Sequence, residues 1–177
     1  MLQKDNIVLR APELADVDFL YLLENDNRLW HLSNTLRPFS HFDLEQFILQ
    51  SEKDIFAAGQ ARFIIEKVDG KKRKIVGAID LFAVEAKHRR AGIGIIVVEE
   101  ERGKGLASTA LDILIDYAFT FLNLHQLYCN IEASNEKSLQ LFETKGFLSV
   151  GKKIDWNMHN GAWVDEFLLQ LINQEKR

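Results

Sequence analysis

Apolar positions recur along this chain with two periods, one typical of helices and one typical of strands. A spacing of three to four residues predicts helices at 13–25, 40–59 and 135–147, and a helix of about 17 residues from Ala107 onward. Short apolar runs bounded by turn residues predict strands at 6–12, 61–68, 74–84, 88–98, 125–133, 147–156 and 162–172. The resulting order, β-α-α-β-β-β-α-β-α-β-β, predicts a mixed α/β fold dominated by antiparallel pairing in its first half.

Residues that start or stop elements support these boundaries. Pro12 ends the first strand, and Ser40 and Asp43 are candidate caps of the second helix, which ends at Gly59. Asp69-Gly70, between two strands, is a strong hairpin signal. The chain shows no internal repeat, low-complexity tract or linker, so we expect one domain over residues 1–177.

Composition places the chain among ordinary globular proteins. Its 177 residues are 47% hydrophobic and 27% charged, and a net charge of −4 argues against a general nucleic-acid binder. No stretch approaches the ~20 apolar residues of a membrane span, and the first residues lack the apolar core of a signal peptide. The single cysteine, Cys129, excludes an intramolecular disulfide. We therefore expect a cytoplasmic protein without a membrane or nucleic-acid partner.

A cationic, glycine-rich turn separates a predicted strand from a predicted helix. In VVEEERGKGLASTAL, residues 97–111, Gly103 and Gly105 leave the backbone bare at a helix N-terminus, where N–H groups and the helix dipole suit a phosphate. The spacing matches neither a P-loop nor the dinucleotide-binding motif. The turn also fits a plain strand-to-helix connection in which Arg102 and Lys104 offset the solvated acids at 99–101.

Two separate motifs resemble the signatures of the GNAT superfamily of acyl-CoA-dependent N-acetyltransferases. Arg102-x-x-Gly105-x-Ala107 is similar to the family's Arg/Gln-x-x-Gly-x-Gly/Ala signature. NEKSLQLFETKGF, residues 135–147, resembles its Asn-x-x-Ser/Ala-x-x-Leu-Tyr-x-x-x-Gly-Phe block. The resemblance implies a GNAT fold, with a mixed, mostly antiparallel sheet flanked by helices, and acetyl transfer from acetyl-CoA to an amine without a metal.

The resemblance also implies a set of cofactor-binding residues. Backbone N–H groups of the turn would hold the pyrophosphate of acetyl-CoA, and the preceding strand edge would pair with the pantetheine arm. Asn135 would bind the arm from the other side, although it is equally suited to cap its helix. The implied residues are Ile96, Val97, Val98, Arg102, Gly103, Lys104, Gly105, Leu106, Ala107, Asn135, Lys137, Ser138 and Phe142.

Acetyl transfer requires a neutral amine and a departing thiol. Deprotonating a lysine-like amine of pKa ~10.4 at pH 7 costs roughly 4.6 kcal/mol, whereas releasing a thiol of pKa ~8.5 as thiolate costs about 2 kcal/mol. Many family members protonate that thiol with a tyrosine in the second motif, but the matching residue here is Phe142. Either Tyr128, Ser138 or a water replaces this acid, or catalysis proceeds without it.

The general base is sought among acids and histidines. Asp80 stands inside the apolar sequence GAIDLFA, where a charge needs a partner or a function. It is predicted either as a salt-bridged structural acid or as the catalytic, substrate-facing carboxylate. The alternatives are Glu85, His88, His125, the acids at 99–101 and a base acting through ordered water. Cys129 has no evident activating partner, so we expect direct attack in a ternary complex.

The acceptor is implied by a closer resemblance. The stretches HRRAGIGIIVVEEERGKGLA, YAFTFLNLHQLY and NEKSLQLF are similar to those of bacterial spermidine N-acetyltransferases. This implies a polyamine acceptor, with Glu24, Asp26, Trp30 and Asp80 as candidate substrate-binding residues. The branch that acetylates ribosomal-protein N-termini shares the style of the opening segment, so a protein N-terminus is an alternative acceptor. A third reading, because of Phe142, is an acyl-CoA-binding protein with little turnover.

The apolar segment EFLLQLI, residues 166–172, predicts a strand whose edge could pair with a second copy of the chain. Core packing explains the same residues equally well, so a homo-oligomer is an open prediction.

Overall fold

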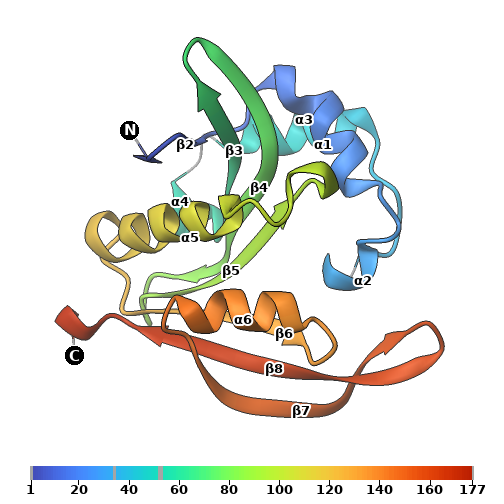
Figure 1. Cartoon of the computed structure of the whole chain (residues 1–177), viewed down its shortest axis with the longest axis vertical. Helices are drawn as coiled ribbons and strands as arrows, with labels where there is room; N and C mark the ends of the chain where they lie inside the picture. Colours follow the sequence, from blue (N-terminus) through green and yellow to red (C-terminus); the bar gives the residue numbers. More distant parts are fainter. Residues whose placement is uncertain (1, 34, 52–53, 177) are drawn as a thin grey trace.

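The computed structural model describes residues 2–33, 35–51 and 54–176, which form one eight-stranded sheet with helices on both faces (Figure 1). The strands lie in the order β1-β2-β3-β4-β5-β6-β8-β7, and every neighbouring pair is antiparallel except β5–β6. Their bounds are β1 Leu2–Lys4, β2 Ile7–Arg10, β3 Ala61–Asp69, β4 Lys72–Glu85, β5 Arg90–Val97, β6 Gln126–Glu132, β7 Leu148–His159 and β8 Ala162–Ile172. This is the mixed, mostly antiparallel architecture that the sequence predicts.

The helices bury two separate cores against the two faces of the sheet. They are α1 Val17–Glu24, α2 Trp30–Ser33, α3 His41–Gln50, α4 Ile55–Ala58, α5 Leu106–Asp116 and α6 Glu136–Thr144, with shorter 3₁₀ turns at Leu14–Asp16, Glu99–Glu101 and Gln174–Lys176. The larger core lies under α5 and α6, and the smaller one lies under α1 and α3. Ile64 belongs to the smaller core and Ile65 to the larger, so β3 is buried on both faces. That burial explains the unbroken apolar run at Phe63, Ile64 and Ile65 in the middle of β3.

Several element boundaries differ from the prediction. The helix predicted at 40–59 is two helices, α3 and α4. Residues 52 and 53 of this prediction lie outside the described residues, and so do residues 1, 34 and 177 of the predicted domain. The helix predicted from Ala107 begins at Leu106 and ends in a π-helical turn, Tyr117–Phe121. The prediction omits β1 and α2, which are too short to show a period.

Of the two explanations left open for residues 166–172, packing within the fold is correct and a free strand edge is not. This segment belongs to β8, which is paired with β6 on one side and β7 on the other, so its backbone groups are used inside the sheet. In the described part of the sheet, the edge strands are β7, which pairs only with β8, and the three-residue β1, which pairs only with β2. Among the described residues, no helix is both long and apolar enough to cross a membrane.

The sheet splits where β5 meets β6. The two strands pair in parallel only over residues 90–92 and 126–128. Beyond Gly92, β5 continues along β4 to Val97, while β6 continues along β8 to Glu132. A wedge therefore opens between β5 and β6, bordered by two strand edges that no longer pair with each other.

Candidate active site

The turn after β5 presents bare backbone at the start of α5. Gly103 and Gly105 have φ values of 74° and 77°, a left-handed conformation that favours glycine. Gly105 is the N-cap of α5 and has no side chain to cap it. In the part of the chain that the structure describes, the amides of residues 103–108 have no protein acceptor. Such free amides at a helix N-terminus fit the pyrophosphate of acetyl-CoA.

The charged residues of the turn form hydrogen bonds and ion pairs with one another. Lys104 Nζ donates to Glu100 O at 2.8 Å and to Glu101 Oε2 at 3.0 Å, and Lys74 Nζ lies 2.5 Å from Glu101 Oε1. Hydrogen bonds from Lys74 and Lys104 lower the pKa of Glu101 to about 2. Glu101 thus balances Lys104 as predicted, but it is buried rather than solvated. Arg102 Nε donates to Val97 O at 2.8 Å, so its side chain lies across the end of β5.

Three cavities that share lining residues follow the wedge. One of about 700 Å³ lies between the α1–α2 segment and the ends of β5 and β6. A second, of about 130 Å³, lies inside the wedge, and a third, of about 480 Å³, opens beside it. Leu32 lines all three, while Gly94 and Asn130 are shared by the second and third. The arrangement gives a continuous path from the turn, through the wedge, to a further chamber.

Six of the thirteen predicted cofactor-binding residues lie along the first two cavities. Val97, Val98, Arg102 and Asn135 line the largest one, and Asn135, Ser138 and Phe142 line the wedge. Asn135 Oδ1 also accepts a hydrogen bond from Ser138 N at 3.2 Å. Asn135 therefore caps its helix, as predicted, and lines the cavities at the same time.

The other predicted cofactor-binding residues fall into three groups. The turn itself consists of Gly103, Lys104, Gly105, Leu106 and Ala107. The side chain of Leu106 is buried, so only its backbone amide is available to a ligand. Ile96 lines the third cavity rather than the first two. Lys137 is exposed and lines none of the three.

The third cavity holds an arginine between two predicted site acids. Arg62 Nε and Nη2 donate to Asp80 Oδ1 and Oδ2 at 2.7 and 3.0 Å, and its Nη1 donates to Glu24 Oε1. Burial lowers the pKa of Arg62, but the two carboxylates raise it by more, so the guanidinium stays charged. Asp80 is therefore salt-bridged, as one of its two predictions states, and it also lines the cavity, while its catalytic role stays a prediction.

Further charges and rings complete this chamber. Lys153 Nζ donates to Glu166 Oε1 at 2.7 Å and lies 4.7 Å from the ring centre of Trp156. Trp30 and Phe82 add two more aromatic walls. Three carboxylates, those of Glu24, Asp80 and Glu166, thus face two cations, those of Arg62 and Lys153. The chamber is net negative by one charge.

Two predicted residues lie away from this chamber. Tyr128 packs edge-on against Phe82, with ring centres 5.9 Å apart, and lines a separate cavity with Arg90. Burial raises the pKa of Tyr128. Because it lines a separate cavity, Tyr128 is not placed to protonate a thiol in the wedge.

Asp26 lines the largest cavity and is paired with Arg28 at 2.7 Å, which holds the pKa of Asp26 below its usual range.

Of the other candidate bases, Glu99 and Glu100 line the largest cavity, Glu101 is paired with Lys74 and Lys104, and the remaining three lie elsewhere. Glu85 pairs with Arg90 at 2.7 Å, and neither His88 nor His125 lines any of the three cavities. Sequence reasoning missed Arg62, Lys153 and Glu166. The available signal for Arg62 was its position in an apolar strand across the Asp69-Gly70 hairpin from Asp80. No comparable signal exists for the residues of β7 and β8.

The chain matches the acetyltransferase (GNAT) domain family over residues 6–148. The protein belongs to the GNAT acetyltransferases. It is therefore an acetyl-CoA-dependent N-acetyltransferase, and the GNAT fold expected from its sequence is confirmed. The free amides of the turn are consistent with acetyl-CoA as cosubstrate.

Individual relatives of this GNAT acetyltransferase differ in how much of it they match. The spermidine N(1)-acetyltransferase of Vibrio cholerae is 31% identical over 163 residues, covering 90% of this chain and 88% of the relative. The putative ribosomal N-acetyltransferase YdaF of Bacillus subtilis is 35% identical over 101 residues, covering 57% of this chain and 55% of the relative. The crystal structure of the Vibrio cholerae spermidine N-acetyltransferase with CoA and spermine superposes with a TM-score of 0.86 at 28% identity, covering 98% of both chains.

Proposed function

We propose that this enzyme transfers the acetyl group of acetyl-CoA to a primary amine of a polyamine such as spermidine. The observation that carries the proposal is the chamber beside the wedge, in which Glu24, Asp80 and Glu166 stand among the rings of Trp30 and Trp156. Carboxylates and aromatic faces both attract ammonium groups. The similarity to the Vibrio cholerae enzyme and to its structure with spermine, over nearly the whole chain, supports the same acceptor class.

The cofactor side of the site positions the thioester. Amides of residues 103–108 hold the pyrophosphate, and the edge of β5 at Ile96, Val97 and Val98 pairs with the pantetheine arm. Asn135 and Ser138 contact the arm from α6, where they line the wedge. Acetyl-CoA supplies an activated acyl group, which these contacts bring to the boundary between the wedge and the acceptor chamber.

The acceptor side prepares the amine. Asp80 takes the proton from the bound ammonium, directly or through a water, while Arg62 fixes the orientation of the carboxylate. The neutral nitrogen then forms a bond to the acyl carbon as the carbon–sulfur bond breaks. Because Phe142 has no hydroxyl, the thiolate takes its proton from solvent.

The testing experiment measures CoA release from acetyl-CoA with spermidine, spermine, a diamine, an aminoglycoside and an N-terminal peptide. We expect turnover with a polyamine, and a loss of about 100-fold or more in kcat/KM for Asp80→Asn. Glu85→Gln is the matched control, because Glu85 lies on the same strand in an arginine pair but outside the chamber. It should keep full activity.

Three outcomes contradict parts of this proposal. Turnover with the peptide alone would assign a protein N-terminus as acceptor, the second candidate, which the 35% identity to the putative ribosomal enzyme favours. Full polyamine turnover by Asp80→Asn would remove Asp80 as the base. No turnover with any amine, despite thermal stabilisation by acetyl-CoA, would place the acceptor outside the amine classes of the panel.

We also propose that the protein self-associates through the hairpin of β7 and β8. This hairpin forms one end of the sheet (Figure 1) and carries exposed large apolar side chains. They are Leu148, Val150, Ile154, Trp156, Met158 and Trp163. So many large apolar side chains exposed on one hairpin are typical of an interaction surface.

A further inference from the structure

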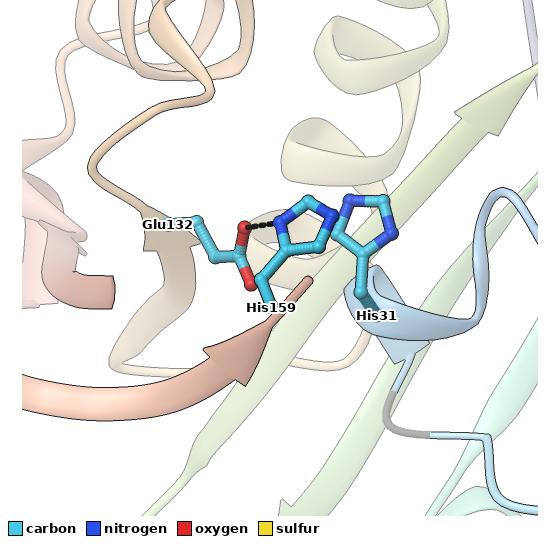
Figure 2. Close-up of side chains that lie close together, drawn as sticks. All are labelled: His31, Glu132 and His159. Atoms are coloured by element: carbon cyan, nitrogen blue, oxygen red, sulfur yellow. Dashed lines mark ion pairs between the residues drawn. The ribbon is translucent and has the colours of Figure 1, made fainter. Parts of the chain in front are cut away.

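Two histidines and a glutamate from three distant segments meet beside the wedge (Figure 2). His31 belongs to α2, Glu132 ends β6, and His159 ends β7. All three offer a ligand atom within 4.8 Å of the others. His159 Nδ1 lies 3.3 Å from Glu132 Oε2, and its ring stacks on that of His31 with centres 4.0 Å apart. The proposed acetyl transfer uses none of these side chains.

The second carboxylate oxygen of Glu132 is buried without a partner among the described residues. Glu132 is 5% exposed, and among the described residues its Oε1 has no hydrogen-bond partner. A buried carboxylate oxygen without a partner is costly. The contact with His159 involves only Oε2, so it leaves Oε1 without a partner in the part of the chain that the structure describes. A single cation bound by neutral imidazoles and the carboxylate satisfies all three groups.

The chemistry of the ligands selects the kind of cation. Magnesium and calcium prefer oxygen ligands, whereas two imidazole nitrogens and a carboxylate are typical of zinc and similar transition metals. Ligand atoms at zinc distances of about 2.0–2.2 Å in a tetrahedron lie about 3.4 Å apart. The 3.3 Å between His159 Nδ1 and Glu132 Oε2 fits this spacing. His31 offers a ligand atom within 4.8 Å of the other two, and its ring, which now stacks on His159, has to move closer and turn to complete the set.

We propose that His31, Glu132 and His159 bind a divalent transition-metal ion such as Zn²⁺. Three protein ligands leave one coordination position for water. The ion would join α2, which lies over the cofactor path, to the ends of β6 and β7 on the other side of the wedge. His31 and Glu132 also line the two cavities proposed to hold the cosubstrate, but neither side chain takes part in the proposed transfer, so the site can be tested without turnover.

The test is calorimetric titration of the chelator-treated full-length protein with Zn²⁺, without acetyl-CoA or amine. We expect one ion per chain, and binding weakened by at least tenfold in His159→Gln, Glu132→Gln and His31→Gln. Titration with Co²⁺ should give a visible absorption band that the same variants lose. Mg²⁺ should not bind at this site.

His41→Gln is the matched control. His41 also stacks on a ring, that of Tyr21 at 4.0 Å, and also lies 3.3 Å from a carboxylate, that of Asp18. It is more exposed and lacks a second imidazole, so this variant should bind Zn²⁺ like the wild type. The proposal is overturned by absent Zn²⁺ binding at micromolar concentrations, or by equal binding in His159→Gln and wild type. Should Glu132→Gln fail to fold, the two histidine variants, which alter partly exposed side chains, decide the question.

Discussion

Phe142 lines the wedge in which the thioester is proposed to lie, and it presents a ring without a hydroxyl. The ring is buried and packs edge-on against Phe147, with centres 5.1 Å apart. A thiol of ordinary pKa leaves unprotonated at a cost of about 2 kcal/mol at pH 7, well below the cost of deprotonating the amine. At the scale of single residues, catalysis therefore depends more on Asp80 than on the missing acid.

Phe142→Tyr should increase turnover. The added hydroxyl would face the cavity of about 130 Å³ and could protonate the departing thiolate. We expect kcat to rise several-fold, with an upper limit of about 30-fold set by the 2 kcal/mol available, and KM for acetyl-CoA to stay unchanged. Steady-state kinetics of CoA release measure both constants.

A matched control separates this effect from a general change in packing. Phe147→Tyr places a hydroxyl on the partner ring, which is fully buried in the core and lines none of the three cavities. It should leave kcat unchanged or lower it through lost stability. A decreased or unchanged kcat in a well-folded Phe142→Tyr would show that thiol protonation does not limit the reaction.

The cofactor side of the site was predictable from the sequence because its geometry is local. Gly103 and Gly105 set the turn within a few residues, and Asn135 is fixed by the helix that it caps. Arg62 meets Asp80 only through the pairing of two strands, and Lys153 and Glu166 meet through another pair. Strand pairing depends on bulges, which leave no clear periodic signal in a single sequence.

At the scale of elements, one bulge decides the pairing between β3 and β4. From the turn as far as Glu66, each residue of β3 pairs with the residue that a regular hairpin gives. The register then shifts by one, so that Ile65 pairs with Gly77 and Arg62 pairs with Asp80. Without the shift, Arg62 would pair with Ile79, and the ion pair that fixes the proposed base would not form. The hairpin itself, in contrast, was predicted correctly from Asp69-Gly70.

Gly77→Ala should damage this region. A Cβ at Gly77 would lie 2.1 Å from the carbonyl oxygen of Ile96, a backbone atom of the strand edge proposed to pair with pantetheine. Either the register moves or β5 is displaced, so we expect a loss of about 1–3 kcal/mol in the free energy of unfolding and a raised KM for acetyl-CoA. Urea denaturation and steady-state kinetics measure the two effects.

Gly151→Ala provides the comparison within the same sheet. A Cβ there meets nothing within 4 Å, and its φ does not lie in the left-handed region. This variant should match the wild type in both measurements. Equal stability and equal KM for Gly77→Ala would show that β5 tolerates the displacement.

At the scale of the whole molecule, the described sheet ends in the short strand β1 on one side and in the long strand β7 on the other. β7 is the last strand, and its apolar side chains face solvent, with Ile154 64% exposed. An edge strand with exposed apolar side chains pairs readily with another copy unless it is shielded. The sequence alone left open whether residues 166–172 form a sheet edge, because the apolar pattern of a strand does not reveal which strands lie beside it.

Ile154→Glu should weaken self-association. A charge within the apolar patch would have to be desolvated in the interface, so we expect a shift toward monomer in sedimentation-velocity experiments. Leu36→Glu is the control, since Leu36 is 95% exposed but lies in a different part of the chain. A wild-type protein that sediments as a monomer at all concentrations would contradict the proposed interface.

Only three residue pairs join β5 to β6 in the described sheet. Few hydrogen bonds therefore connect the half formed by β1–β5 to the half formed by β6–β8. The cosubstrate arm that is proposed to lie in the wedge would take the place of a strand there. Since it binds only the folded chain, a concentration of 100 times its Kd adds about 2.7 kcal/mol to the free energy of unfolding. Free CoA carries the same arm, so the lifetime of the protein against proteolysis should follow the supply of acetyl-CoA and CoA together. A cell depleted of both would lose this enzyme by degradation.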